Sequence, residues 1–296
     1  QVRTRLSWRQ AWLAVMAAIM KNKMKSLWSG KIIFNRKLRP LHFHLGLSLP
    51  EAFADPYPGQ FVMLRPVGPG GPLLSRPFSI YNFNRGQDQV RIEILYRVTG
   101  AGTEMMSALR GGMTVTILGP LGKGFVIDGQ KRNHLLVAGG MGMAPIAFLA
   151  GYLHRKGSAE TRVITCLGAK NCDDLLGLEQ LEKLSDILNI ATEDGAMGSC
   201  GMVTDFLPEL LKEYDPAETN VYACGPMPML KSLAGRLATV PKLSCQVSVE
   251  ERMACGVGAC LGCAVPLLDA RGRITQKSVC KYGPVFASSK ICWERL

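Results

Sequence analysis

Four cysteines near the C-terminus have the spacing of an iron–sulfur ligand set. Cys255, Cys260 and Cys263 follow a C-x4-C-x2-C pattern, and Cys280 comes after sixteen further residues. This is the plant-type arrangement for a [2Fe-2S] cluster, in which four thiolates hold two irons. The residues between the first three are mostly glycine and alanine, which let a loop curl and turn its amides toward the sulfurs. The segment therefore predicts a cluster-binding loop.

Zinc binding and disulfide formation are the alternatives for these four cysteines. A structural zinc site more often pairs its cysteines in two short hairpins, which this spacing matches poorly. Disulfides are typical of short, loop-rich secreted chains, whereas this chain has long apolar runs and fits a reducing cytoplasm. Five further cysteines lack ligand spacing and are interpreted as incidental thiols: Cys166, Cys172, Cys200, Cys245 and Cys292.

A glycine turn in the middle of the chain is typical of nucleotide binding. In VAGGMGMAPI (137–146), Gly139, Gly140 and Gly142 separate a strand-like run from a helix-like run, and Pro145 falls in the first helical turn. Such a turn lets a pyrophosphate approach the backbone and the helix amides. A tight turn that binds nothing would look the same in isolation.

A second loop of this kind is YACGPMPML (222–230). It follows another strand-like run, at the end where open α/β sheets bind ligands. Cys224, Gly225 and Pro226 form its turn, and we expect Cys224 to face the cleft. A Cys-Gly-Pro turn is also a common structural feature, so this loop alone does not decide the function.

Two polar stretches in the first half suit a flavin nucleotide. RPFSIY (76–81) offers Arg76 to a pyrophosphate and the Ser79 hydroxyl to the edge of a flavin ring. GAGTEMMSAL (100–109) offers a glycine turn with Thr103 as the N-cap of a short helix, which is a second anion site. Each stretch is also compatible with ordinary turn chemistry.

Two different patterns of apolar residues position these motifs. From residue 31 to about residue 129, short alternating runs separated by Gly and Pro predict a small antiparallel barrel. From residue 133, short apolar strands alternate with helix-like stretches at 145–156, 173–185, 203–213 and 227–238, which predicts a parallel sheet wrapped by helices. The runs are KIIFNRK, LHFHLGLSL, GQFVMLRP, PFSIYNF, QVRIEILYRV and TVTILGP in the first part, and HLLVAGG, RVITCLG, ILNIAT and NVYACG in the second.

The net charge of +12 is concentrated at one end of the chain. Residues 1–50 hold ten of the 35 Lys and Arg residues and no Asp or Glu, which leaves 25 basic against 23 acidic residues elsewhere. The rest of the chain therefore lacks the basic face that a nucleic-acid groove needs, and we expect no nucleic-acid partner.

Residues 1–30 have the pattern of a basic amphipathic helix. The apolar run AWLAVMAAIM (11–20) is about half the length of a bilayer span and ends at lysines. Apolar residues at three- and four-residue steps favour a helix packed on its own domain or on a partner subunit, or else a peripheral contact with an anionic membrane. No small-residue cleavage site follows, which disfavours a signal peptide.

Taken in order, the motifs RPFS, GAGT, LGPLGKGF, AGGMGMAP, CGPMPM and ERMACGVGACLGCAV, with VCKYGPVF, resemble those of a known family. This family comprises the electron-transfer subunits of two-subunit, NAD-linked dihydroorotate dehydrogenases, which are ferredoxin-reductase-like flavoproteins. The resemblance spans residues 31 to about 290, and the first 30 residues have no counterpart in it. It implies an FAD-binding barrel at 31–130, an NAD-binding domain at 131–242 and a [2Fe-2S] domain at 243–296, and it leaves 1–30 as the basic helical extension indicated by the residue pattern.

The resemblance also implies roles for individual residues. Phe78 stands where broader relatives often have a flavin-stacking tyrosine, which leaves the stacking partner of the flavin open. The implied FAD contacts are Arg76, Pro77, Phe78, Ser79, Tyr96, Arg97, Val98, Gly102 and Thr103; the nicotinamide nucleotide contacts are Gly139, Gly140, Gly142, Pro145, Gly225 and Pro226, with Cys224 beside the nicotinamide as the nearest to a catalytic residue; and the iron ligands are Cys255, Cys260, Cys263 and Cys280.

The expected function is electron transfer between NAD(H), FAD and the cluster, and on to or from a partner flavoprotein in a cytoplasmic hetero-oligomer of pyrimidine biosynthesis. Asp173 and Asp174, after the second strand, favour NAD because they would repel a 2′-phosphate, although Lys170 nearby would attract one. Two alternatives stay open: a diaphorase subunit of another complex, such as a ferredoxin-linked transhydrogenase or a sulfide dehydrogenase, and a non-catalytic redox scaffold.

Overall fold

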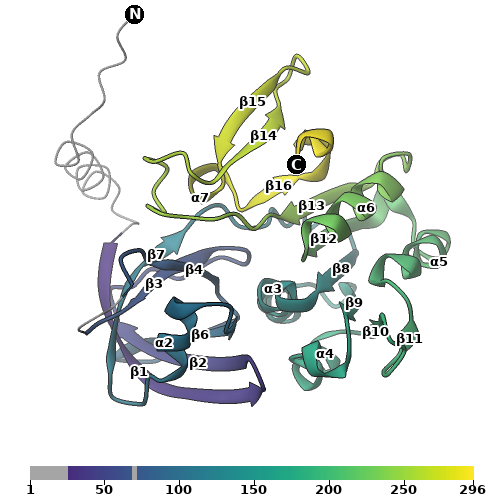
Figure 1. The fold of residues 1–296 in the computed structure, drawn as a ribbon. Helices are drawn as coiled ribbons and strands as arrows, with labels where there is room; N and C mark the ends of the chain where they lie inside the picture. Colours follow the sequence, from purple (N-terminus) through teal and green to yellow (C-terminus); the bar gives the residue numbers. More distant parts are fainter. Residues whose placement is uncertain (1–25, 69–71) are drawn as a thin grey trace, which may run out of the picture.

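A computed structural model describes residues 26–68 and 72–296 in three parts (Figure 1). An antiparallel sheet forms a barrel-like first part, a parallel sheet wrapped by helices forms the second, and a small hairpin lies above both. This is the fold class that the two apolar patterns predict. No helix in these two described ranges is long and apolar enough to span a membrane.

Seven antiparallel strands make the barrel-like sheet, in the order β4-β3-β7-β1-β2-β6-β5. Alternating apolar residues point into its core: on β6, Val90, Ile92 and Ile94 are fully buried, whereas Arg91 is exposed. The short helix α2 follows β6. The elements are β1 (Ser26–Arg39), β2 (His42–Pro50), β3 (Phe61–Pro66), β4 (Arg76–Ser79), β5 (Asn82–Arg85), β6 (Gln89–Arg97), α2 (Ala101–Ser107) and β7 (Thr114–Leu121).

The second sheet has the order β11-β10-β9-β8-β12-β13-β16, and all of its pairs are parallel except β13 with β16. Its central strands are buried on both faces, which explains their continuous apolar runs. The elements are β8 (Asn133–Gly139), α3 (Met143–Lys156), β9 (Arg162–Ala169), α4 (Leu178–Leu184), β10 (Ile187–Thr192), β11 (Ser199–Cys200), α5 (Leu207–Glu213), β12 (Thr219–Cys224) and α6 (Met227–Leu237).

The C-terminal part begins within this same sheet. Strands β13 (Ser244–Ser248) and β16 (Val285–Ala287) extend the parallel sheet beyond β12. Between them, β14 (Ala264–Leu268) and β15 (Ile274–Ser278) form the hairpin, followed by the single turn α7 (Val279–Tyr282). The cysteine segment is therefore attached at both ends to the sheet of the second part.

The structure corrects two sequence-based expectations about helices. The helix predicted over residues 1–30 lies outside the described residues up to residue 25, but 26–30 belong to strand β1. They pair with β7, where Leu27 lies opposite Leu118, so backbone pairing overrides the helical spacing there. The helix predicted over 173–185 exists only as α4, because Gly177 before it has a positive φ of 65° that interrupts the helix.

Helix α3 packs against the barrel as well as against its own sheet. Phe148 is 3% exposed and belongs to the barrel core, while Tyr81 and Leu95 of the barrel belong to the core around α3. This apolar contact holds α3 against the barrel, where α3 touches β5 and the 3-10 turn before it touches β6.

The two turns predicted to bind nucleotide are in direct contact. A methyl group on Gly142 would overlap the carbonyl of Cys224 and lie 2.7 Å from the amide nitrogen of Gly225. The backbones of the turns after β8 and β12 can approach this closely only because no side chain stands at residue 142.

Replacing Gly142 with alanine should therefore destabilise the fold. We expect a loss of about 1–3 kcal/mol in the free energy of unfolding, because backbone atoms rather than a flexible side chain must move. Denaturant unfolding measures this, with Gly129→Ala as the matched control, since a methyl group there meets nothing within 4 Å. Equal stability of the two variants would contradict the contact.

Candidate functional site

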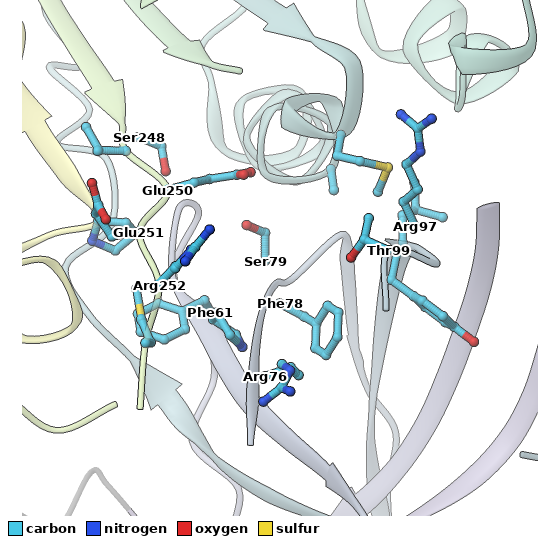
Figure 2. Close-up of a pocket in the computed structure, with 18 of the residues that line it drawn as sticks. Phe61, Arg76, Phe78, Ser79, Arg97, Thr99, Ser248, Glu250, Glu251 and Arg252 are labelled. Carbon is cyan, nitrogen blue, oxygen red and sulfur yellow. The ribbon is translucent and has the colours of Figure 1, made fainter. Parts of the chain in front are cut away.

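A cavity of about 740 Å³ lies where the three parts of the molecule meet (Figure 2). One wall comes from β4 and β6 of the barrel, a second from Met141 and Ala144 at the start of α3, and a third from residues 248–253, at the end of β13 and beyond it. This volume is within the range of cofactor sites in proteins. Each part of the fold thus contributes to one shared site.

The barrel wall presents residues that were predicted from the sequence. Arg76, Pro77, Phe78 and Ser79, which form strand β4, are all half-buried and all line the cavity. In Figure 2, Ser79 lies nearer to the helix whose start lines the cavity, while Arg76 and Phe78 lie lower on the barrel side. The aromatic ring of Phe78 meets Tyr96 edge to face at 6.0 Å. Strand β4 therefore presents a cation, an aromatic edge and a hydroxyl to the same space.

The start of α2 lies beside Arg76. A methyl group on Gly102 would lie 3.2 Å from Nε of Arg76, so the lack of a side chain at Gly102 leaves room for the guanidinium. Thr103 was expected to be the N-cap, but it is the third residue of the helix, and Gly100 is the N-cap. Its hydroxyl accepts hydrogen bonds from the backbone amides of Thr99 and Gly100. Gly102 and Thr103 are buried and do not line the cavity themselves.

Strand β6 contributes Tyr96 and Arg97 to the cavity wall, but Val98 is not part of that wall. Tyr96 is 1% exposed, and its hydroxyl donates a hydrogen bond to Oδ1 of Asn35 inside the barrel. Arg97 is exposed, and its side chain points away from Arg76 in Figure 2. The roles of these three residues toward FAD stay predictions.

The glycine turn after β8 has the backbone that the sequence predicts. Gly140 has a φ of +52°, and the turn continues as a single 3-10 turn directly into α3. Gly139 and Gly142 are buried against the turn after β12, and Pro145 is buried within α3. Of this segment, Met141 and Ala144 reach the cavity.

Cys224 does not face an open cleft. It is 1% exposed, it does not line the cavity, and burial raises the pKa of its thiol. Its neighbour Gly225 is also buried, whereas Pro226 is exposed. Its backbone carbonyl lies against Gly142, and its side chain packs in the apolar core around α3. A neutral, enclosed thiol supports packing here, and its catalytic role stays a prediction.

The third wall of the cavity was not predicted from the sequence. Ser248, Glu250, Arg252 and Met253 line it, because β13 delivers them at the carboxyl end of the parallel sheet. The only signal for this wall is the short strand β13, whose run SCQVS resembles a linker more than a strand. Glu250 is exposed toward the cavity, but the protein around it removes much of its hydration, and this burial raises its pKa.

The four predicted iron ligands lie together in the structure. Cys263 and Cys280 are buried, Cys255 is half-buried, and Cys260 is exposed. Hydrogen bonding with the Cys280 thiol, together with the amides of Val257 and Cys260, lowers the pKa of Cys255 to about 4. The same hydrogen bond raises the pKa of Cys280. The loop therefore stabilises a sulfur anion, which is the form that binds iron.

The backbone of the cysteine loop follows a path that glycine permits. Gly256 and Gly258 have φ values of +69° and +81°. A methyl group on Gly256 would lie 2.6 Å from Cγ of Met63, so the loop rests on barrel strand β3. The amide of Gly262 also donates to the sulfur of Cys260 at 3.5 Å.

The chemistry of the ligand set fits a two-iron cluster. A [2Fe-2S] cluster takes two cysteine sulfurs at each iron. Together with the amides that turn toward the sulfurs, the four thiols suit that centre.

The charges around the cavity suit an anionic cofactor. Arg76, Arg97 and Arg252 line it, together with the carboxylates Glu250 and Glu251. One guanidinium group can donate two parallel hydrogen bonds to the oxygens of a phosphate. A hydroxyl such as that of Ser79 can orient the edge of a flavin ring through a hydrogen bond. The residues present therefore fit a flavin carrying a diphosphate.

Only one of the two acidic residues expected to favour NAD is free to do so. Asp174 faces the barrel, where its Oδ1 lies 3.6 Å from Nε2 of His42 and 3.7 Å from Nη1 of Arg97. Asp173 and Lys170 are exposed on the same loop. Asp174 is therefore engaged elsewhere and is not available to repel a 2′-phosphate.

Comparison with family models and curated proteins identifies relatives along most of the chain. Residues 136–234 match an oxidoreductase NAD-binding domain, and residues 250–292 match the iron–sulfur cluster binding domain of dihydroorotate dehydrogenase B. The chain is 36% identical over 273 residues to the electron transfer subunit of dihydroorotate dehydrogenase B (NAD(+)) from Desulforamulus reducens, covering 92% of this chain and 100% of that one. The same subunit from Caldanaerobacter subterraneus is 39% identical over 80% of this chain and 87% of the relative.

Solved structures share the fold. An NADH-dependent reduced ferredoxin-NADP oxidoreductase, described in connection with flavin-based electron bifurcation, matches with a TM-score of 0.76 and 27% identity, over 90% of this chain and 91% of the other. A ferredoxin reductase of carbazole 1,9a-dioxygenase matches with a TM-score of 0.62 and 22% identity, over 74% of this chain and 67% of the other.

Glu250 should make the stability of the chain depend on pH. Because its pKa is raised in the folded chain, the folded chain holds this proton more tightly than the unfolded chain, whose Glu titrates near 4.5. The stabilisation is complete below that value and is lost as the pH rises through the folded-state pKa. Glu250→Gln cannot become charged. The melting temperature of the wild type should therefore fall relative to that of Glu250→Gln as the pH rises over this interval. A constant difference across pH contradicts the assignment.

Removing one sulfur ligand should remove the cluster without removing the flavin. Cys260→Ser is expected to abolish the visible absorbance and the bound iron of the cluster, while FAD stays bound to the barrel. Cys200→Ser is the matched control, because Cys200 is also exposed but lies outside the ligand spacing. Unchanged iron content in Cys260→Ser would overturn the ligand assignment.

Proposed function

Because the chain belongs to the family of electron transfer subunits of NAD-linked dihydroorotate dehydrogenase B, we propose that it carries electrons between NAD(H) and a catalytic partner subunit. It is an NAD-linked flavin and iron–sulfur oxidoreductase subunit, and its cofactors are FAD and a [2Fe-2S] cluster. In the complete enzyme, the partner oxidises dihydroorotate, a step of pyrimidine biosynthesis.

One observation carries this proposal: a single cavity is bounded by all three parts of the fold. Arg252 and Met253 line the cavity, and Cys255 follows two residues later. Strand β3 makes a second connection, because Phe61 lines the cavity while Met63 contacts the cysteine loop. A flavin in this cavity would therefore lie next to the cluster, with no need for a mobile carrier between them.

The residues of the chain bind and orient; none of them needs to exchange a proton. When bound, the flavin accepts two electrons as a hydride and releases them one at a time. Arg76 would hold its diphosphate and Ser79 its ring edge. The turn at Gly140 would hold the nicotinamide nucleotide at the start of α3. The cysteine loop, which follows the third wall of the cavity, would hold the cluster.

A cytoplasmic location is part of the proposal. The four cysteines of the cluster loop must stay reduced to bind iron, which is expected of a protein kept in a reducing compartment. A hetero-oligomer with the catalytic flavoprotein subunit follows from the names of the relatives.

A second candidate function is that of a diaphorase subunit in another complex. The 27% identity with the NADH-dependent reduced ferredoxin-NADP oxidoreductase, over 90% of this chain, favours it. Both functions share the path from NAD(H) through flavin to cluster and differ only in the partner. The partner that copurifies with the native chain decides between them.

NADH oxidation with an artificial one-electron acceptor tests the shared path. We expect turnover by the purified chain loaded with FAD and iron, and additional dihydroorotate-dependent reduction of NAD⁺ when the catalytic subunit is present. The flavin-free chain is the control and should show no turnover. A loaded chain that does not oxidise NADH would leave only a redox scaffold.

A further inference from the structure

One carboxylate joins the nucleotide-binding domain to the barrel. Asp174 lies in the short turn after β9, and its Oδ1 approaches Nε2 of His42 at 3.6 Å and Nη1 of Arg97 at 3.7 Å. His42 and Arg97 are opposite each other on strands β2 and β6 of the barrel. The carboxylate of one domain thus faces a cross-strand pair of the other.

Two of the three side chains in this contact are shielded from water, whereas the third, Arg97, is 43% exposed. The side chain of Asp174 is 17% exposed and that of His42 only 5%. Burial lowers the pKa of His42, and Arg97 lowers it further, although Asp174 and Asp173 act in the opposite direction. The imidazole is therefore neutral near pH 7, and the guanidinium of Arg97 balances the charge of Asp174.

One end of the contact lines the cofactor cavity, and the other end packs against the start of α3. Arg97 lines the cavity, and in Figure 2 its side chain extends from β6 toward the nucleotide-binding domain. On the other side, the loop that contains Asp174 continues to Gly177, where a methyl group would overlap Met143 and lie 3.4 Å from the hydroxyl of Tyr81. Met143 begins α3, so the loop is packed between the barrel and the helix that carries the glycine turn.

We propose that Asp174 is a positioning residue that holds the nucleotide-binding domain against the barrel and so sets the distance between nicotinamide and flavin. This inference rests on the proposed function for its catalytic consequence, but the contact itself does not. It assigns to Asp174 a role different from that expected from sequence, which was discrimination against a 2′-phosphate. A misplacement of about 1 Å between reacting groups can slow a reaction about a hundredfold.

Amide hydrogen exchange on the full, cofactor-loaded chain tests the contact directly. Asp174→Asn should speed exchange several-fold in the barrel peptides covering 41–43 and 96–98, where the amide of Val98 donates to the carbonyl of Leu41. The matched control is Asp205→Asn, which breaks an ion pair with Arg236 of 3.0 Å within the nucleotide-binding domain. It should leave the barrel peptides unchanged.

Stopped-flow reduction of the flavin by NADH tests the consequence. We expect Asp174→Asn to slow this step about ten- to a hundredfold, to weaken the charge-transfer absorbance of nicotinamide with flavin, and to leave the ratio of NADH to NADPH rates unchanged. Asp174→Glu keeps the charge and should recover most of the rate. Asp205→Asn should match the wild type.

The outcomes separate this proposal from the proposed function. If the wild type is reduced by NADH but Asp174→Asn is reduced equally fast with unchanged barrel exchange, the positioning role is wrong and the function stands. A changed ratio of NADH to NADPH rates without faster barrel exchange would return Asp174 to cofactor selection. A wild type that NADH does not reduce defeats the proposed function, while the exchange comparison still decides the contact.

If the variant does not fold, hydrogen exchange of the wild type with and without about 1 M salt tests the contact instead. Salt screens the ion pair and should speed exchange in the same barrel peptides. An unchanged exchange pattern overturns the proposal.

Discussion

The packing of α3 against the barrel is the contact on which the whole site depends. Phe148 lies in the barrel core, while Tyr81 and Leu95 of the barrel lie in the core around α3. Apolar contact of this kind is not directional, so it holds two surfaces together without fixing their exact angle. Polar contacts around it, such as the ion pair of Asp174 with Arg97 at 3.7 Å, add an attraction at a defined place on each surface. The cavity exists because both kinds of contact act at the same junction.

The cysteine segment spans this junction, because it is attached to the parallel sheet and also contacts the barrel. It leaves the parallel sheet after β13 and returns to it at β16, and between these strands its loop rests on Met63 of the barrel. The segment therefore contacts both halves of the molecule. A chain with this connectivity places a metal centre at a domain junction without a separate linker, which keeps the distance from cavity to cluster short in every copy of the molecule.

Much of the fold could be predicted from short-range patterns, whereas the errors arose where long-range contacts decide. Alternating and continuous apolar runs located the strands, because burial on one or two faces leaves a direct record in the sequence. The four cysteines were predicted as a set by spacing, and the structure brings them together.

By contrast, Leu27 continues a helical spacing but pairs with the distant Leu118. Cys224 was expected to face a cleft, but its side chain packs in the apolar core around α3. Glu250 was missed because only the pairing of β13 with β12 shows that Glu250 follows the ligand-binding edge of the sheet. The contact of Asp174 with the barrel was missed because no sequence pattern near Asp174 indicates a residue so distant in the chain.

The cysteine loop is shielded unevenly, since Cys263 and Cys280 are buried while Cys260 is exposed. Dioxygen, peroxide and chelators dissolved in the surrounding water therefore meet the metal centre first at one corner. Thiolate oxidation follows accessibility, so damage to the isolated chain should begin at that corner and reach the buried pair of sulfurs last.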